Sequence, residues 1–366
     1  MKICTITCHN VNNFGASLQA TALCEYLRGL GHDARVIDYM PVRRHSSRRS
    51  RLRTILEWPL FRPVARLIDN YREYRRRDRR RRFASYLSAL PLTGRYTSLC
   101  QLRDNPPQAD LYIAGSDQIW NPRLANGRDP AFYLHFGPAS VRRASYAASF
   151  ASGRLPVDSF HNMQSRLSHL DHISVRESSG LDILSSLGYE GRQVVDPVFL
   201  LPRSYWDTAA DSSEIHHKGD YILLYGFDAG SLIMDTARRL SKETGLPVVS
   251  ISPYPVKGVK KNYCNAGPLE FLSLVRGASA VLTESFHALA FAMIFHVPFY
   301  AFRRSENLNA RITDFLATLG LSRRLITSEA VTLPPLDMDF TVPDTLLSNM
   351  RDSSVDYLDH ITSQAV

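Results

Sequence analysis

The sequence has few cysteines, and those it has are scattered. The five cysteines, Cys4, Cys8, Cys24, Cys100 and Cys264, form no CxxC pair and show no zinc-ligand spacing. A disulfide framework and a structural zinc site are therefore not expected. Free thiols at irregular spacing are typical of proteins from a reducing cytosol.

Three further patterns are missing, and each absence argues against a class of protein. The opening "MKICTITCHN" begins as an expected strand and shows no basic-plus-apolar signal segment. The longest apolar run, residues 281–302, is interrupted by His287, His296 and Pro298, so we do not expect a membrane span. The loop after the first strand contains only Gly15, so a dinucleotide-binding GxGxxG motif is absent. We expect a cytoplasmic globular protein, in line with 44% hydrophobic and 22% charged residues.

Positive charge is concentrated in one segment. From Arg43 to Arg82 the chain has sixteen arginines, no lysine and four acidic residues, whereas the remainder is slightly acidic. Pro59 and Pro63 break this segment early, and the apolar spacing from Val64 predicts a helix. Two interpretations stay open: a solvated arginine-rich helix, or a peripheral contact with an anionic membrane surface at its inner face. Nucleic acid is not an expected partner, because no recognised RNA-binding module accompanies the arginines.

The order of apolar segments predicts an α/β fold of two Rossmann-like, doubly wound domains. Short β-branched runs alternate with amphipathic helices in both halves of the chain, which is typical of parallel sheets. We predict a first domain at 1–205 with a basic helical insertion at about 43–95, a linker at 206–220, a second domain at 221–335 and a tail helix at 336–366. Ligands in such sheets bind at the carboxyl ends of the strands, so we expect a site in a cleft between the domains.

Polar residues at the ends of expected strands are the candidates for chemistry. His287 lies in the first turn of a helix expected to begin near Phe286, with Ser285 as its N-cap. The dipole there favours an anion and disfavours imidazolium, so a neutral base stays available. Asp117, in "IAGSDQIWNP", is a candidate base or hydroxyl-binding carboxylate, with Trp120 as a platform for a sugar ring. The alternatives are a hydrogen-bonded core histidine and a carboxylate that caps the next turn.

A third strand end carries a cation. Arg176, in "ISVRES", presents a guanidinium fork suited to a carboxylate or a phosphate. The alternative is a salt bridge to Glu177 or Asp182. Two other polar residues are interpreted as structural: His296 at the end of its helix, and Asp196 as part of a hinge and turn.

Several blocks of the chain resemble a known family. In order, "NNFGASLQATAL", "GSDQIWNP", "SYAASF", "ISVRE", "DPVFLL" and "ESFHALAFAMIFHVPF" resemble the blocks of the polysaccharide pyruvyl transferase family, and "NARITDFLATLGL" is similar to its final helix. The resemblance runs from about Thr5 to Leu321 and leaves the basic insertion unmatched. It implies a glycosyltransferase-B-like architecture. It also implies transfer of pyruvate from phosphoenolpyruvate to hydroxyls of a cell-surface polysaccharide or lipid-linked saccharide, forming a ketal. Phosphoenolpyruvate is a co-substrate here, and neither a cofactor nor a metal is expected.

The resemblance also implies roles for matching residues. Asp117 matches the family's strand-end aspartate, Arg176 its arginine in the "VRE" block, and His287 its histidine. We assign His287 to acid–base catalysis near the leaving phosphate, Asp117 to the acceptor hydroxyl and Arg176 to the donor. The expected acceptor-binding residues are Asn13, Gln19, Gln118 and Trp120.

One donor-binding arginine of the family is missing. Members with an Arg-Leu-His block use that arginine on the donor, whereas this chain has Ser285-Phe286-His287. We expect Ser285 itself to bind the donor. The candidates to supply the missing positive charge are Arg311, Lys257 and Lys260.

Two other functions stay open. A nucleotide-sugar glycosyltransferase of similar fold often has two carboxylates eight residues apart, but Arg276 precedes Glu284 by eight residues and Ala292 follows it by eight. The other alternative is a non-catalytic saccharide-binding or assembly protein that kept the fold.

Overall fold

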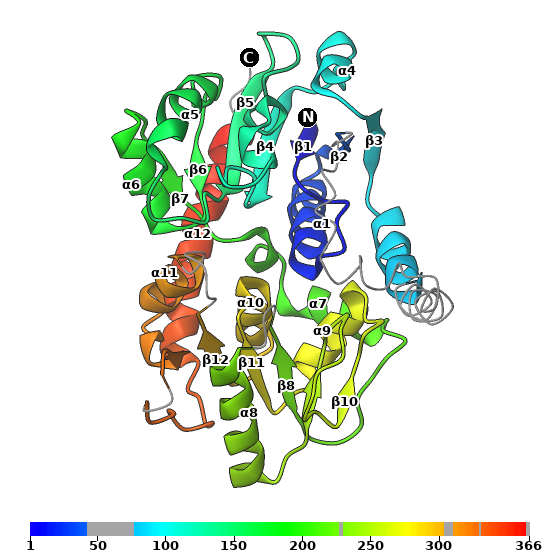
Figure 1. Cartoon of the computed structure of the whole chain (residues 1–366). Coiled ribbons are helices and arrows are strands. Elements are labelled where there is room, and N and C mark those ends of the chain that lie inside the picture. The colour runs from blue at the N-terminus through cyan, green and yellow to red at the C-terminus, as the bar shows by residue number, and fades with distance from the viewer. Residues whose placement is uncertain (42–76, 227–229, 304–309, 329–330, 364–366) are drawn as a thin grey trace, which may run out of the picture.

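The computed structural model describes residues 1–41, 77–226, 230–303, 310–328 and 331–363. Most of the arginine-rich segment lies outside these residues. The helix expected from Val64 and the expected contact with an anionic membrane therefore stay predictions. Figure 1 shows the two halves of the chain one above the other, each built around a sheet.

Two parallel sheets confirm the predicted α/β fold. The first has the order β3-β2-β1-β4-β5-β6-β7 and the second the order β10-β9-β8-β11-β12-β13. Both orders reverse once, between β1 and β4 and between β8 and β11, which defines the doubly wound Rossmann arrangement. The strands of the first sheet are β1 (Lys2–Ile6), β2 (Asp33–Tyr39), β3 (Leu92–Tyr96), β4 (Leu111–Asp117), β5 (Arg142–Ala148), β6 (Ser174–Val175) and β7 (Arg192–Gln193). Those of the second are β8 (Ile222–Tyr225), β9 (Val248–Ser250), β10 (Lys261–Asn262), β11 (Ala280–Thr283), β12 (Phe299–Phe302) and β13 (Leu325–Ile326).

Helices connect these strands. They are α1 (Phe14–Gly29), α4 (Leu99–Asp104), α5 (Phe160–Leu167), α6 (Ser178–Ser186), α7 (Arg203–Asp211), α8 (Ser231–Thr244), α9 (Pro268–Arg276), α10 (Phe286–Ile294), α11 (Ala310–Thr318) and α12 (Thr341–Ser363). The central strands are buried along nearly their whole length, as expected when helices cover both faces of a parallel sheet. Among the described residues, no helix combines the length and the apolar composition that crossing a membrane requires.

Two predicted segments differ from the structure. The basic helical insertion was expected to reach residue 95, but helix ends at 88 and Leu92–Tyr96 form β3, paired with β2 at the sheet edge. A strand with one buried face usually alternates apolar and polar residues. The segment "LTGRY" lacks this alternation, so its sequence does not predict β3. The linker expected at 206–220 begins inside α7, where Trp206 is fully buried.

The two halves are packed against each other through aromatic side chains. Phe14 at the start of α1 stacks on Phe271 of α9, with ring centroids 4.7 Å apart, and on Phe83 at 5.3 Å. One apolar core includes Ile3 of the first sheet and Val281 of the second. Burial of this aromatic surface, rather than a flexible hinge, sets the position of α1 against the second half.

The tail helix α12 lies alongside both halves (Figure 1). The Tyr357 hydroxyl donates to the Ser145 carbonyl at 2.9 Å, and the Ser354 hydroxyl accepts from Val195 N–H at 2.9 Å. Near its start, Asp344 lies 2.9 Å from Nε2 of His296, just after α10. The helix therefore joins the two sheets, and His296 serves as one of its contacts.

Candidate active site

The two points of strand-order reversal face each other across the junction of the halves. His287, the second residue of α10, has its imidazole against Gly15, the second residue of α1. A Cβ on Gly15 would lie 2.0 Å from Nδ1 of His287, so only glycine permits this approach. The N-terminal turns of two helices thus converge on one imidazole. Their positive dipole ends favour binding of an anion there.

Side-chain caps define where both helices begin. The Ser285 hydroxyl accepts from Ala288 N–H at 3.5 Å, as the sequence predicted for the N-cap of α10. Asn13 caps α1, and its Oδ1 accepts from Ala16 N–H at 3.1 Å. The amide oxygen of Asn13, expected to bind an acceptor, is therefore engaged in positioning the helix start.

Replacing Gly15 with alanine is expected to disturb this junction. The methyl group overlaps the His287 ring, so either α1 moves or the imidazole shifts, and overpacking of this kind costs about 1–3 kcal/mol. Gly29→Ala is the matched control, because its Cβ meets nothing within 4 Å on the same helix. Urea unfolding should show a lower midpoint for Gly15→Ala only. Equal midpoints for the two variants would contradict the close contact.

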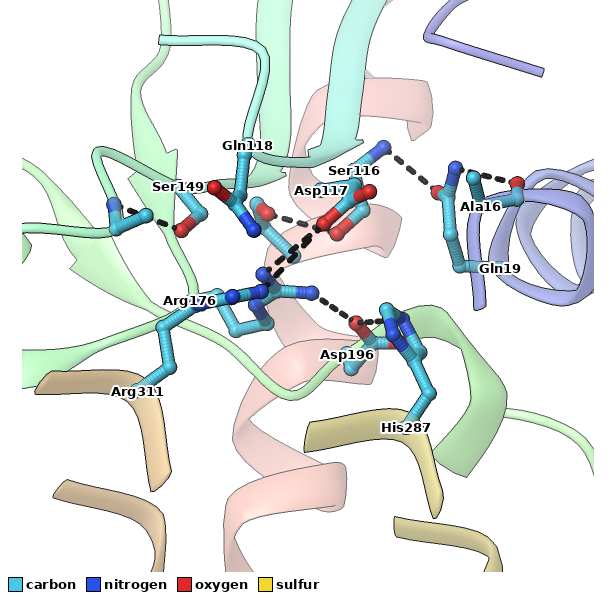
Figure 2. A network of polar contacts seen from close by, with 12 residues as sticks. Ala16, Gln19, Ser116, Asp117, Gln118, Ser149, Arg176, Asp196, His287 and Arg311 are labelled. Carbon is cyan, nitrogen blue, oxygen red and sulfur yellow. Dashed lines mark hydrogen bonds and ion pairs between the residues drawn. The ribbon is translucent and has the colours of Figure 1, made fainter. Parts of the chain in front are cut away.

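A buried charge network joins the strand ends beside this junction (Figure 2). Arg176 Nη1 lies 2.5 Å from Asp196 Oδ2, and its Nη2 lies 3.4 Å from Asp117 Oδ1. Asp196 Oδ2 also lies 3.3 Å from Nε2 of His287. The guanidinium sits 4.7 Å from the Phe286 ring centroid, where a cation–π contact holds it. The structure therefore brings together all three residues predicted from the strand ends: Asp117, Arg176 and His287.

The pKa values of the two aspartates follow from this arrangement. Burial alone would raise the pKa of Asp196, but His287 and Arg176 outweigh it and hold that pKa well below its usual range. Burial opposes ionisation of Asp117 too, yet Arg176, His287 and Arg311 lower its pKa. Both carboxylates are ionised at neutral pH. A carboxylate with a lowered pKa is a weak general base, so Asp117 is better suited to bind a hydroxyl than to deprotonate it.

Arg311 brings a second guanidinium to the network from α11 of the other half. Its Nη1 lies 3.7 Å from Asp117 Oδ1. The hydrogen bonds of Gln118 are satisfied when the oxygen and nitrogen of its amide group exchange places. The oxygen then accepts from Arg311 Nη1 at 3.0 Å and from Arg311 Nη2 at 2.6 Å. Of the three cations expected to replace the family's missing arginine, Arg311 is the one at the network. No ion pair among the described residues joins Lys257 or Lys260 to it.

The structure contradicts the expected role of Trp120. Its ring is fully buried and stacks on Tyr133, with centroids 5.6 Å apart and planes 8° apart. Its Nε1–H donates to the Phe132 carbonyl at 3.0 Å. A sugar has no access to either ring face, so Trp120 supports the loop after β4 from beneath. The sequence placed it near a strand end but did not reveal which side of the loop it faces.

The structure also contradicts the expected acceptor role of Gln19. Gln19 is fully buried, and each polar group of its amide is used within the protein. The oxygen accepts from Ser116 N–H at 3.0 Å, while the nitrogen donates to Thr7 Oγ1 and to the Ala16 carbonyl, both at 3.0 Å. Figure 2 shows this amide between α1 and Ser116, next to Asp117 at the end of β4. Gln19 therefore positions the site and is not available to a ligand.

Asp196 is the residue that the sequence interpretation missed. Its Oδ1 does accept from Val198 N–H at 3.2 Å, as expected for a turn, but its Oδ2 contacts Arg176 and His287. The alternative partner of Arg176, Glu177, is farther away at 3.9 Å. The position of Asp196 in the sequence could have marked it as a site residue. It follows β7, just as Asp117 ends β4 and Arg176 follows β6.

A small cavity lies on one side of the network, among the residues that the structure describes. The cavity beside Arg176, Asp196 and Arg311 has a volume of about 20 Å³, room for about one water molecule. Asp314 of α11 accepts from Ser179 N–H of α6 at 3.2 Å, a further contact between the two halves.

The comparisons with known proteins agree with this architecture. The family model described as polysaccharide pyruvyl transferase matches residues 13–306. UDP-GlcNAc 2-epimerase from Methanocaldococcus jannaschii shares 13% identity over 100% of both chains, with a TM-score of 0.57. The S. aureus MnaA structure solved with UDP shares 14% identity over 98% of this chain and 88% of that one, with a TM-score of 0.51. These structures show a glycosyltransferase-B-type fold and, at such identity, nothing more. No curated protein matches the chain.

Proposed function

The chain belongs to the polysaccharide pyruvyl transferase family, and from this premise we propose that it transfers pyruvate from phosphoenolpyruvate to hydroxyls of a saccharide acceptor, forming a ketal. As a member of that family the protein is a transferase. The donor, the two-hydroxyl acceptor and the roles given to individual residues below belong to the proposal.

The observation that carries the proposal is that two guanidinium groups and one imidazole lie in one charge network beside two helix N-termini. Phosphoenolpyruvate has a phosphate and a carboxylate, and each suits a guanidinium fork. Arg176 and Arg311 approach the same carboxylate, Asp117, from opposite halves of the protein. We infer that Arg311 takes the place of the arginine that the family's Arg-Leu-His block would supply. The donor anions would then replace part of the contacts that Asp117 and Gln118 now make.

The chemistry needs one proton donor and one proton acceptor. A proton adds to the methylene carbon of the donor, which becomes a methyl group. A sugar hydroxyl attacks the adjacent carbon and loses its proton, and the bond from this carbon to the phosphate oxygen breaks. A second hydroxyl closes the ketal at the same carbon and loses its proton. One of the two hydroxyl protons makes up for the proton added to the methylene carbon. The other leaves with the phosphate.

His287 is the side chain suited to move these protons. It sits beside the proposed phosphate position and can both give and take a proton, whereas the lowered pKa of Asp117 makes that carboxylate a weak base. Asp196, on Nε2, holds the ring in one orientation, while the close approach of Gly15 confines the Nδ1 side. Asp117 then binds and orients the acceptor hydroxyl through its free lone pairs.

The proposal is tested by incubating candidate saccharides with phosphoenolpyruvate and analysing them by mass spectrometry. We expect a pyruvyl adduct and an equal amount of released phosphate. Arg311→Gln should weaken donor affinity about tenfold or more, because loss of a charge-assisted hydrogen bond costs roughly 1.5–3 kcal/mol. Arg323→Gln, an exposed arginine in the same half, is the matched control.

Binding can be followed without an acceptor. Thermal-shift titration should show stabilisation by phosphoenolpyruvate in the wild type, less in Arg311→Gln and an unchanged shift in Arg323→Gln. Stabilisation by nucleotide sugars together with none by phosphoenolpyruvate would instead favour a glycosyltransferase.

A further inference from the structure

A second cavity lies between helices of both halves, away from the charge network. Its volume is about 620 Å³, within the roughly 300–1,000 Å³ typical of ligand pockets. Its walls come from α1, the helix at residues 77–88 (cyan in Figure 1), α7 and the start of α9. None of the described residues in these walls belongs to the charge network, and no step of the proposed chemistry uses them.

The position of the cavity along α1 separates it from His287. Gly15, which contacts the imidazole, is the second residue of this helix, whereas Thr21 and Glu25 line the cavity. At a rise of about 1.5 Å per residue, these two residues lie about 9 Å and about 15 Å farther along the helix axis than Gly15. The cavity is therefore a separate site on the same helix that meets His287.

The arginines in the walls are already paired with acidic groups. Arg82 Nη2 donates to Glu214 Oε2 at 2.9 Å, and its Nε lies 3.3 Å from Glu270 Oε1. Arg82 and, to a smaller extent, Arg81 lower the pKa of Glu214. Together with Glu25, the described lining residues include three carboxylates and two guanidinium groups. The cavity therefore has no excess of positive charge to attract an anion.

Aromatic and apolar side chains also line the cavity. Tyr86 comes from the helix at residues 77–88 and Tyr205 from α7, and both are partly buried. Leu90 and Leu269 add apolar surface. Burial, with Glu25 nearby, raises the pKa of Tyr205 to about 12. Its hydroxyl therefore stays protonated and can both donate and accept a hydrogen bond.

This combination suits a neutral ligand with many hydroxyl groups. An anion would meet three carboxylates, and a cation would meet Arg81 and Arg82. A wholly apolar ligand would bury carboxylates without giving them a hydrogen-bond donor, which is costly. A sugar ring has an apolar face that can pack on tyrosine, and its hydroxyls can donate to carboxylates.

We propose that this cavity binds a neutral oligosaccharide segment of the acceptor, at a distance from the sugar that receives pyruvate. The inference rests on the proposed function in one respect, namely that the acceptor is a saccharide chain. Glu25 accepts hydrogen bonds from the sugar hydroxyls, and Tyr205 packs against a sugar ring. Because the two sites hold one chain, binding in the cavity raises the effective concentration of acceptor hydroxyls near His287.

The test is binding of the full chain to an array of neutral oligosaccharides of glucose, galactose, mannose and N-acetylhexosamines, followed by isothermal titration with the tightest ligand. We expect saturable binding that Ser85→Trp abolishes, because Ser85 is an exposed helix residue that lines the cavity and an indole fills the space. Ala84→Trp is the matched control, since Ala84 is exposed on the same helix but does not line the cavity. Glu25→Gln, which hardly changes the side-chain volume, should weaken binding about tenfold through loss of charge-assisted hydrogen bonds.

The outcomes separate this inference from the proposed function. Absence of binding to every oligosaccharide on the array overturns the inference, even if phosphoenolpyruvate still stabilises the protein. Equal losses of affinity in Ser85→Trp and Ala84→Trp overturn it as well. Binding that Arg311→Gln weakens and Ser85→Trp does not also overturns it, because the saccharide then lies at the charge network. Binding that depends on Ser85 and Glu25 supports the cavity site even where no pyruvyl adduct forms, a result that would count against the proposed function alone.

Discussion

His287→Ala should lower kcat/KM for pyruvyl transfer by about 10²–10⁴-fold, the usual contribution of a general acid or base. The imidazole lies at the meeting point of two helix N-termini and 3.3 Å from Asp196, whose lowered pKa makes that carboxylate a poor substitute for it. Steady-state kinetics with a pyruvylated product as the readout measure the effect. The loss should fall mainly on kcat, since the proposed donor contacts are made by Arg176 and Arg311 rather than by His287.

A histidine just beyond the other end of the same helix provides the control for this variant. His296 follows α10 at its other end, has a side chain 44% exposed and pairs with Asp344. His296→Ala should leave kcat/KM close to that of the wild type. Full turnover by a folded His287→Ala protein would remove the histidine from the mechanism. Comparable losses in both variants would point to a structural effect of α10.

Asp196→Asn is expected to be the most destabilising of the single substitutions considered. Removing one partner of a buried ion pair typically costs about 3–5 kcal/mol, because the other charge is left without compensation. In the variant, Arg176 would still have Asp117 at 3.4 Å and Glu177 at 3.9 Å. Both contacts are weaker than its contact with Asp196 at 2.5 Å. Denaturant unfolding at pH 7 measures the change. Asp211→Asn, at an exposed pair with Arg276, should change the unfolding midpoint little.

The same substitution predicts a pH dependence. The folded-state pKa of Asp196 is lowered, so its ionised form stabilises the protein above the unfolded value of about 3.9. That stability is lost as the pH falls toward the folded-state pKa. The difference in free energy of unfolding between wild type and Asp196→Asn should be full at pH 7 and shrink below about pH 4. A difference that stays constant down to pH 3 would show that Asp196 acts by packing rather than by charge.

Local patterns were enough to predict the fold and part of the site. Alternating strands and amphipathic helices predicted two doubly wound sheets because period and length are properties of short segments. The strand ends that carry Asp117, Arg176 and His287 followed from the same patterns, since parallel strands place their carboxyl ends at one edge. The cap role of Ser285 depended only on its neighbours along the chain.

Failures arose where a role depends on residues far away in the sequence. Trp120 and Gln19 lie beside the site, but burial against Tyr133 and Ser116 decides that neither meets a ligand. Asp196 was read as a turn because its contact with Val198 is local, whereas its contacts with Arg176 and His287 are not.

By itself, the sequence determined the sheet-forming segments and the strand-end residues, and its family resemblance suggested three candidate cations. The tertiary structure alone decided which of these candidates lies at the network: Arg311 reaches Asp117 because stacking of Phe14 on Phe271 brings the two halves into contact. It likewise decided that Gly15 must lack a side chain, because an imidazole from a helix about 270 residues later occupies that space. Such pairings are set by the packing of whole helices, which no short window of sequence contains.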